Sequence, residues 1–122
     1  MSNPVLTRVA TGTVSTTGAA AFIGGPGANG VIPIAGFNRG TFNVTVAGGV
    51  ETVSVTISCD GGATFSTTKL KVSSIALATI VTDMATATTY YIMDWPAATH
   101  IKFTKSATSA NSATVQYCLT MS

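Results

Sequence analysis

The clearest pattern along this chain is an alternation of apolar and polar residues at every second position. Residues 41–46 and 52–59 alternate without interruption, and the five residues between them begin with Ala47-Gly48-Gly49. A period of two places one side of an extended segment in a core and the other in water, so both segments are expected to be strands. We expect the two strands to pair as a hairpin. Their inward-facing residues are predicted to be Phe42, Val44, Val46, Val53, Val55, Ile57 and Cys59.

The second half of the chain shows the same pattern. Further strands are predicted at residues 69–72, 89–94, 100–104 and 113–121. Ile101 and Phe103 are expected to face inward, and Lys69 and Lys71 to face solvent.

Two segments between these strands have no alternation. Asp60-Gly61-Gly62 favours a turn, because glycine supplies positive φ angles without steric cost. The apolar run 75–81 is too short for periodicity to decide between a short buried strand and a single helical turn.

Seven or eight short strands spaced by roughly ten residues are typical of an antiparallel sandwich. The fold class is therefore predicted to be all-β, an antiparallel β-sandwich with jelly-roll-like topology. One domain is expected, because 122 residues leave little room for two. We place its core in residues 41–122, after a distinct N-terminal region of residues 1–40.

The N-terminal region differs from the core because it is rich in glycine. Residues 24–30 contain four glycines and one proline, which predicts an irregular loop or arm. Val31-Ile32-Pro33-Ile34 is apolar, but Pro33 cannot donate to a strand ladder and therefore suits an edge strand. Two interpretations stay open. The region is either a peripheral hairpin or an extended arm that orders against a neighbouring subunit.

Composition narrows the range of functions. Only 8% of the residues are charged and the formal net charge is +2, which argues against a nucleic-acid binder that neutralises phosphates. So few charges protect a surface poorly against association, which suits a protein inside an assembly. One His and four acids leave most acid–base and metal chemistry without its groups. We therefore expect no enzyme, no metal site and no cofactor.

Expectations about location and redox state follow from the same sequence. The apolar run 75–81 is far shorter than the ~20 residues of a membrane span, and the N-terminus lacks the features of a secretory signal. Assembly in a cytoplasm without membrane contact is expected. In that compartment Cys59 and Cys118 are expected to be reduced and buried, although a disulfide between them stays open.

Several residues are candidates for a binding site. Asp60-Gly61-Gly62 is better explained as a turn than as a calcium loop, because the other acids lie far away in the sequence. His100 is expected to be structural. Tyr90, Tyr91 and Trp95 are a candidate sugar-stacking platform, with core packing as the alternative interpretation.

Three segments of the second half resemble the small β proteins of tailed-phage virions. They are residues 53–65, which end in Ser-Cys-Asp-Gly-Gly-Ala-Thr-Phe, residues 96–103, which contain Ala-Thr-His-Ile-Lys-Phe, and residues 112–117. Such proteins include capsid decoration (cement) proteins and modules of fibres or tails. The resemblance implies a structural protein of a bacteriophage virion. It would be a jelly-roll-like homotrimer on the capsid surface that bridges major capsid proteins.

If the resemblance holds, the N-terminal region supplies the contacts to the capsid. The expected contact residues are Phe22, Ile23, Ile32 and Ile34 as apolar anchors, with Arg8 and Arg39 as cations. Removal of residues 1–30 is expected to abolish capsid binding and to leave the β core folded. The alternative function is a receptor- or carbohydrate-binding module of a phage fibre or tail, or of an adhesin, which would use Tyr90, Tyr91 and Trp95.

Overall fold

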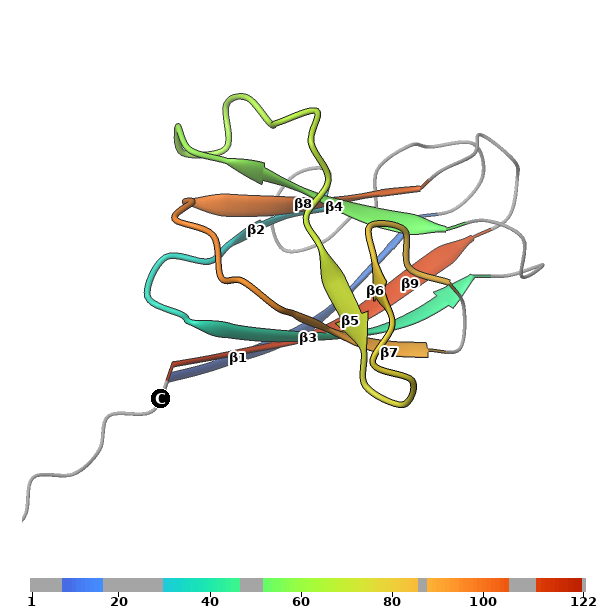
Figure 1. Ribbon diagram of the computed structural model, residues 1–122. Helices are drawn as coiled ribbons and strands as arrows, with labels where there is room; N and C mark the ends of the chain where they lie inside the picture. Colours follow the sequence, from blue (N-terminus) through green and yellow to red (C-terminus); the bar gives the residue numbers. More distant parts are fainter. Residues whose placement is uncertain (1–7, 17–29, 47–51, 86–87, 106–111, 122) are drawn as a thin grey trace, which may run out of the picture.

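The protein folds into two antiparallel β-sheets that face each other, as the computed structural model in Figure 1 shows. The structure describes residues 8–16, 30–46, 52–85, 88–105 and 112–121. Within them no helix is long and apolar enough to cross a membrane. The described residues form the strands β1 (Arg8–Thr16), β2 (Val31–Pro33), β3 (Arg39–Val46), β4 (Val53–Ser58), β5 (Val72–Ser74), β6 (Ile80–Val81), β7 (Thr88–Ile92), β8 (His100–Lys105) and β9 (Ala113–Met121).

The strands divide unequally between the two sheets. The larger sheet has six strands in the order β1-β9-β3-β7-β5-β6, and the smaller has three in the order β2-β8-β4. The predicted all-β antiparallel sandwich is therefore confirmed. A jelly roll has eight strands in two sheets, whereas the described residues form nine. The jelly-roll topology therefore stays a prediction.

The core lies between the inner faces of the two sheets and follows the period-two pattern of the sequence. Phe42 on β3 meets Phe103 on β8 edge to face, with ring centroids 5.0 Å apart and ring planes at 87°. This geometry is the favoured arrangement of two aromatic rings. Val44, Val55 and Ile101 around them are buried, as predicted.

The predicted hairpin of residues 41–46 and 52–59 is wrong, because β3 and β4 lie in different sheets. Both edges of β3 are already occupied, since β9 pairs with one edge and β7 with the other. β4 pairs with β8 instead. The apolar sides of β3 and β4 therefore pack across the sandwich and do not lie side by side in one sheet.

The outer face of the smaller sheet is covered by residues 59–70, which were not expected to fold back over it. Gly62 lies so close to this face that a Cβ atom on it would sit 3.5 Å from Val31 and 3.6 Å from the His100 ring. Ser54 and Ser58, predicted to face water, are buried on this face. Cys59, predicted to be buried, is exposed where β4 has ended.

The two cysteines lie in different parts of the sandwich. Cys118 is half-buried on β9 of the larger sheet, whereas Cys59 follows β4 of the smaller sheet, and both thiols are free. The disulfide that the sequence left open is not formed.

The N-terminal region is part of the sandwich wherever the structure describes it. β1 pairs with β9 along nine residues of the larger sheet, and β2 forms an edge of the smaller sheet. The edge position of Pro33 agrees with the prediction. β1 and β2 do not pair with each other, so they form no peripheral hairpin. Because β1 lies within residues 1–30, removing those residues would take a complete strand out of the larger sheet.

The apolar run 75–81 is not a buried strand, and of the two predicted alternatives the single helical turn agrees with the structure, because one hydrogen bond between residues four apart closes its tip. Residues 75–79 form the tip of a hairpin between β5 and β6, and β6 has only two residues. The tip is closed by Ala78 N–H donating to Ser74 C=O at 3.0 Å, with Ala78 at a positive φ of 51°. A short tip offers no neighbouring sheet to bury its side chains, so they stay exposed.

Gly12 on the inner face of β1 leaves room for the Tyr117 ring of the neighbouring strand. The two residues are directly opposite each other in the β1–β9 pair. A Cβ atom at position 12 would lie 2.5 Å from Tyr117 Oη and 2.7 Å from Cζ. The ring is only 7% exposed and therefore has little freedom to move aside.

We predict that Gly12→Ala destabilises the protein by about 1–3 kcal/mol, the usual cost of overpacking a core. Replacing a glycine within a strand by alanine otherwise raises the free energy of unfolding by roughly 0.5–1 kcal/mol. A loss of stability in Gly12→Ala therefore indicates a clash with the Tyr117 ring. Urea unfolding measures the change. In a Tyr117→Leu background the same substitution should cost less, and Thr45→Ala on the outer face of β3 should change stability by less than about 0.5 kcal/mol. An equal loss of stability from Gly12→Ala in both backgrounds would contradict the inference that Gly12 leaves room for the Tyr117 ring.

Candidate functional site

The outer face of the larger sheet is covered by uncharged polar side chains. The strand register places on it Thr11, Thr13, Ser15, Thr41, Asn43, Thr45, Thr89, Thr114, Gln116 and Thr120. Asn43 Nδ2 donates to Gln116 Oε1 at 3.3 Å, and Thr89 Oγ1 donates to Asn43 Oδ1 at 3.4 Å. Among the described strand residues of this face, Arg39 is the one charged side chain.

At the β5–β6 end of this sheet the hydroxyl surface gives way to exposed apolar side chains. Leu77 is 79% exposed, Ile75 and Ile80 are more than half exposed, and Tyr91 and Met93 are each 40% exposed. We call these five residues the hairpin patch. Apolar groups of this size concentrated in one place on a surface indicate an interaction site.

The hairpin patch is held in place by the strand register and by backbone hydrogen bonds. Ser73 on β5 lies opposite Ile80 on one side and Tyr91 on the other, and is itself 2% exposed. The small serine therefore allows two large side chains to flank it on the same face. The Ile75 N–H donates to Thr89 C=O at 3.0 Å, which ties the hairpin tip to β7.

Two surface hollows flank Ile75. The first, of about 480 Å³, is lined by Arg39 and Thr41 together with Ile75, Tyr91 and Met93 of the hairpin patch. The second, of about 320 Å³, lies on the other side of Ile75, between Leu77 and Thr88. No acidic residue is among those that line the first hollow, and Arg39 is the one charged residue among them.

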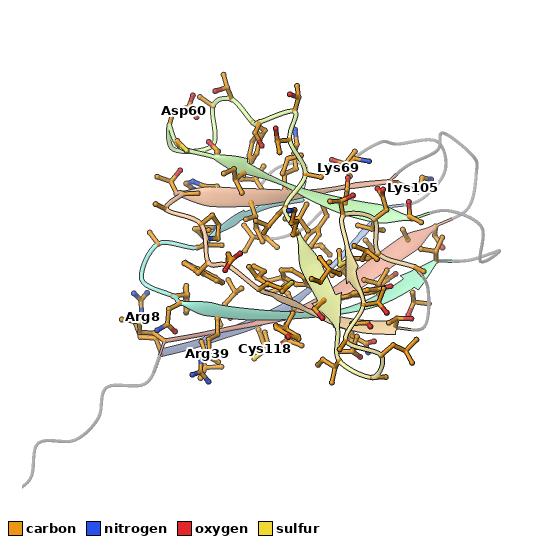
Figure 2. All side chains as sticks on the ribbon, in the orientation of Figure 1. Arg8, Arg39, Asp60, Lys69, Lys105 and Cys118 are labelled. Atoms are coloured by element: carbon orange, nitrogen blue, oxygen red, sulfur yellow. The ribbon has the colours of Figure 1, made fainter. Side chains whose placement is uncertain are left out.

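The structure separates the residues that the sequence grouped as partner contacts. Arg39 lies in the first hollow, beside the hairpin patch. Arg8 and Arg39 are the first residues of β1 and β3 and lie on the same side in Figure 2, but β1 is the sheet edge opposite the hairpin patch. The Arg8 guanidinium is 4.8 Å from the ring centre of Phe37 in the same chain. Ile32 and Ile34 are 2% and 1% exposed within the core, so they offer no surface to a partner. Phe22 and Ile23 lie outside the described residues.

The candidate sugar-stacking residues do not form one platform. Tyr90 and Tyr91 are neighbours on β7 and therefore point to opposite faces of the sheet. Tyr90 is buried, and its hydroxyl accepts a hydrogen bond from Ala85 N–H at 2.9 Å. The Trp95 ring packs over Gly40, where a Cβ atom would lie 3.2 Å from Cζ3. Only Tyr91 of the three belongs to the exposed surface described above.

Four residues of the hairpin patch were missed at the level of sequence. Ile75, Leu77 and Ile80 belong to an apolar run that was expected to be buried or helical, and Met93 was not singled out. The available signal was the short spacing between Ser74 and Thr79. A tip of that length connects two strands and cannot cross the sandwich.

Asp60 organises the loop that covers the smaller sheet. Its carboxylate accepts hydrogen bonds from Thr64 Oγ1 at 2.6 Å, from Thr64 N–H at 3.0 Å and from Ser58 Oγ at 2.7 Å. Gly61 and Gly62 follow with φ angles of 79° and 92°, as the predicted turn requires. The bonds from Thr64 and then from Ser58 stabilise the charged carboxylate and hold the pKa of Asp60 well below its ordinary value of 3.8.

Two buried polar atoms lie on the face of the smaller sheet that this loop covers. His100 lies beneath it, and its Nδ1 atom and Thr56 Oγ1 are buried without a hydrogen-bond partner among the described residues. Within those residues, no three His, Cys, Asp or Glu side chains gather closely enough to hold a metal ion.

Comparison with known proteins finds the same fold in two solved structures. The SPBc2 prophage-derived protein YomS matches with a TM-score of 0.63 at 13% identity, over 97% of this chain and 99% of YomS. The PBSX exported protein XepA matches with a TM-score of 0.71 at 11% identity, over 97% of this chain but 39% of XepA. At such identities the likeness shows the fold alone. No family model and no curated protein sequence matches this chain.

We predict that Asp60→Asn lowers the thermal midpoint by a few degrees at pH 7, because the amide cannot accept all the hydrogen bonds of the carboxylate. The depressed pKa means that the folded state binds fewer protons than the unfolded state, so the stabilisation is full above about pH 4 to 5. It is lost as the pH falls below 3.8. The difference in midpoint between wild type and variant should therefore shrink between pH 5 and pH 2.5, measured by circular dichroism. The exposed Asp94→Asn serves as control, and a difference that does not vary with pH contradicts the role of the carboxylate.

Proposed function

We propose that this protein is a structural component of a phage particle, a decoration protein that binds the major capsid proteins of the shell. The observation that carries this proposal is the hairpin patch, five exposed apolar side chains gathered near Arg39 on a face whose other strand residues mostly carry hydroxyl or amide groups. Likeness in fold to two prophage proteins supports the association with a phage.

The composition of the hairpin patch matches that of protein interfaces. Aromatic residues, methionine and arginine are enriched in interface cores, and Tyr91, Met93 and Arg39 meet in one hollow. Because no acid lines the hollow with Arg39, a complementary partner surface offers an apolar pocket for the hairpin tip and a carboxylate for the guanidinium.

The work of such a protein is mechanical. A hairpin tip seated between two capsid subunits adds contact area to the junction, and any ligand that binds only the assembled state stabilises that state. Many copies on one shell add their contributions, so modest affinity at each position is sufficient. This proposal places the contact surface on the β5–β6 hairpin and not on the N-terminal region. Of the capsid-contact residues expected from the sequence, it keeps Arg39. No catalytic step is involved.

We predict that Ile75→Ser combined with Leu77→Ser weakens binding to capsids at least tenfold, which corresponds to about 1.4 kcal/mol. Both side chains are exposed, so the double variant should fold and unfold like the wild type. Co-sedimentation with purified shells of the phage that encodes the protein measures the affinity. Met121→Ser, an exposed apolar residue outside the hairpin patch, is the matched control and should bind normally.

Two results would contradict this function. Wild-type affinity of the double variant would show that the hairpin patch is not the docking surface. Failure of the wild type to bind shells, together with binding to a glycan array that Tyr91→Ala abolishes, would favour the carbohydrate-binding alternative.

A further inference from the structure

The four sheet edges of the sandwich differ in how well they are protected against pairing with another strand. An unprotected edge presents free N–H and C=O groups, and proteins usually shorten, interrupt or cover such edges. β6 has two residues, and β2 has three, one of them Pro33. β4 is covered by its own chain, since Ser66 N–H donates to Ile57 C=O at 2.8 Å and Leu70 N–H to Val55 C=O at 2.7 Å.

β1 has none of these protections. It is nine residues long, and no described residue pairs with the edge that faces away from β9. It contains no proline, lysine or acidic residue, and its one charge, Arg8, is at its first position. On its outer face Val9 is 60% exposed. An edge of this length, with no charge in its interior, is suited to receive a further strand.

We propose that β1 pairs with β1 of a second copy of this chain, antiparallel and across a two-fold axis at Gly12. This register is the one that brings all nine residues of both strands into pairs. It places Thr11 opposite the partner's Thr13, Val9 opposite the partner's Ser15, and Ala10 opposite the partner's Val14.

The β1 sequence is complementary to itself in this register. Every pair joins two outer-face or two inner-face residues, so the alternation of the sheet continues without a break across the axis. Facing threonines are a favourable cross-strand pair. The two Arg8 side chains lie at opposite ends of the joined strands, about 27 Å apart at 3.4 Å per residue, so they do not repel each other closely. A second copy is therefore the occupant that this edge fits.

The pairing joins two six-stranded sheets into a single sheet. β1 and β6 are the opposite edges of the larger sheet, so the hairpin patch of each subunit stays free at the outer end of the dimer. A dimer of this form presents two docking tips, and a two-fold contact of identical surfaces closes on itself without growing into a filament. The proposal replaces the trimer that the resemblance implied, and it does not depend on the proposed function.

The test introduces charges at Thr11 and Thr13, the two exposed threonines that face each other across the axis. Wild type should have twice the 12.3 kDa chain mass by light scattering after size exclusion. Thr11→Lys with Thr13→Lys should be a monomer, because each lysine then faces a lysine of the partner, and Thr11→Glu with Thr13→Glu should be a monomer for the same reason. Thr11→Glu with Thr13→Lys should remain a dimer, since each glutamate faces a lysine.

A mixture of the doubly lysine and doubly glutamate variants should form a dimer, which native mass spectrometry identifies as mixed. Circular dichroism checks that each variant keeps the fold. A monomeric or trimeric wild type would overturn the proposal, and so would a folded lysine variant that stays dimeric. None of these measurements involves capsids, so this proposal and the proposed function fail separately.

Discussion

The packing of two apolar sheet faces, with the Phe42–Phe103 ring contact at the centre, is the constraint on which the rest of this structure depends. It requires an apolar residue at every second position of each core strand, and it leaves the intervening positions without a packing role. Those positions are filled mainly by threonine and serine, which favour strands or turns and carry no charge. A charge-poor surface is therefore compatible with a well-packed core, and the core sets no limit on what the outer faces do.

The outer faces of the two sheets differ in whether the chain itself covers them. The loop that Asp60 organises closes over the smaller sheet and buries Ser54 and Ser58 there. The larger sheet has no such cover among the described residues, and its hydroxyl face ends at the exposed hairpin patch. Among the described residues, the chain itself therefore covers one outer face and leaves the other exposed. This asymmetry supports an adhesive function more directly than any single residue does.

The connectivity explains where the free surfaces lie. Because successive strands from β1 to β5 alternate between the two sheets, the chain cannot close a hairpin at each turn. Among the described strands the one tight hairpin, β5–β6, lies at one edge of the larger sheet, and β1 lies at the other. The hairpin patch and the free edge of β1 are therefore separated by the full width of the larger sheet, so the two proposed contacts do not compete for the same surface.

The alternation in residues 41–46 and 100–104 was enough to predict strands and their buried faces, and that in residues 113–121 to predict a strand, because a period of two is a local property of the backbone. Pro33 was likewise enough to place its segment at a sheet edge, since a missing N–H acts locally. Pairing was not predictable, because β3 and β4 alternate equally well and the choice of neighbour depends on segments far away. The exposed hairpin and the covered smaller sheet were missed for the same reason. Burial of a short apolar run such as 75–81, or of a serine such as Ser58, is decided by which distant segment lies over it, and only the tertiary structure determines that.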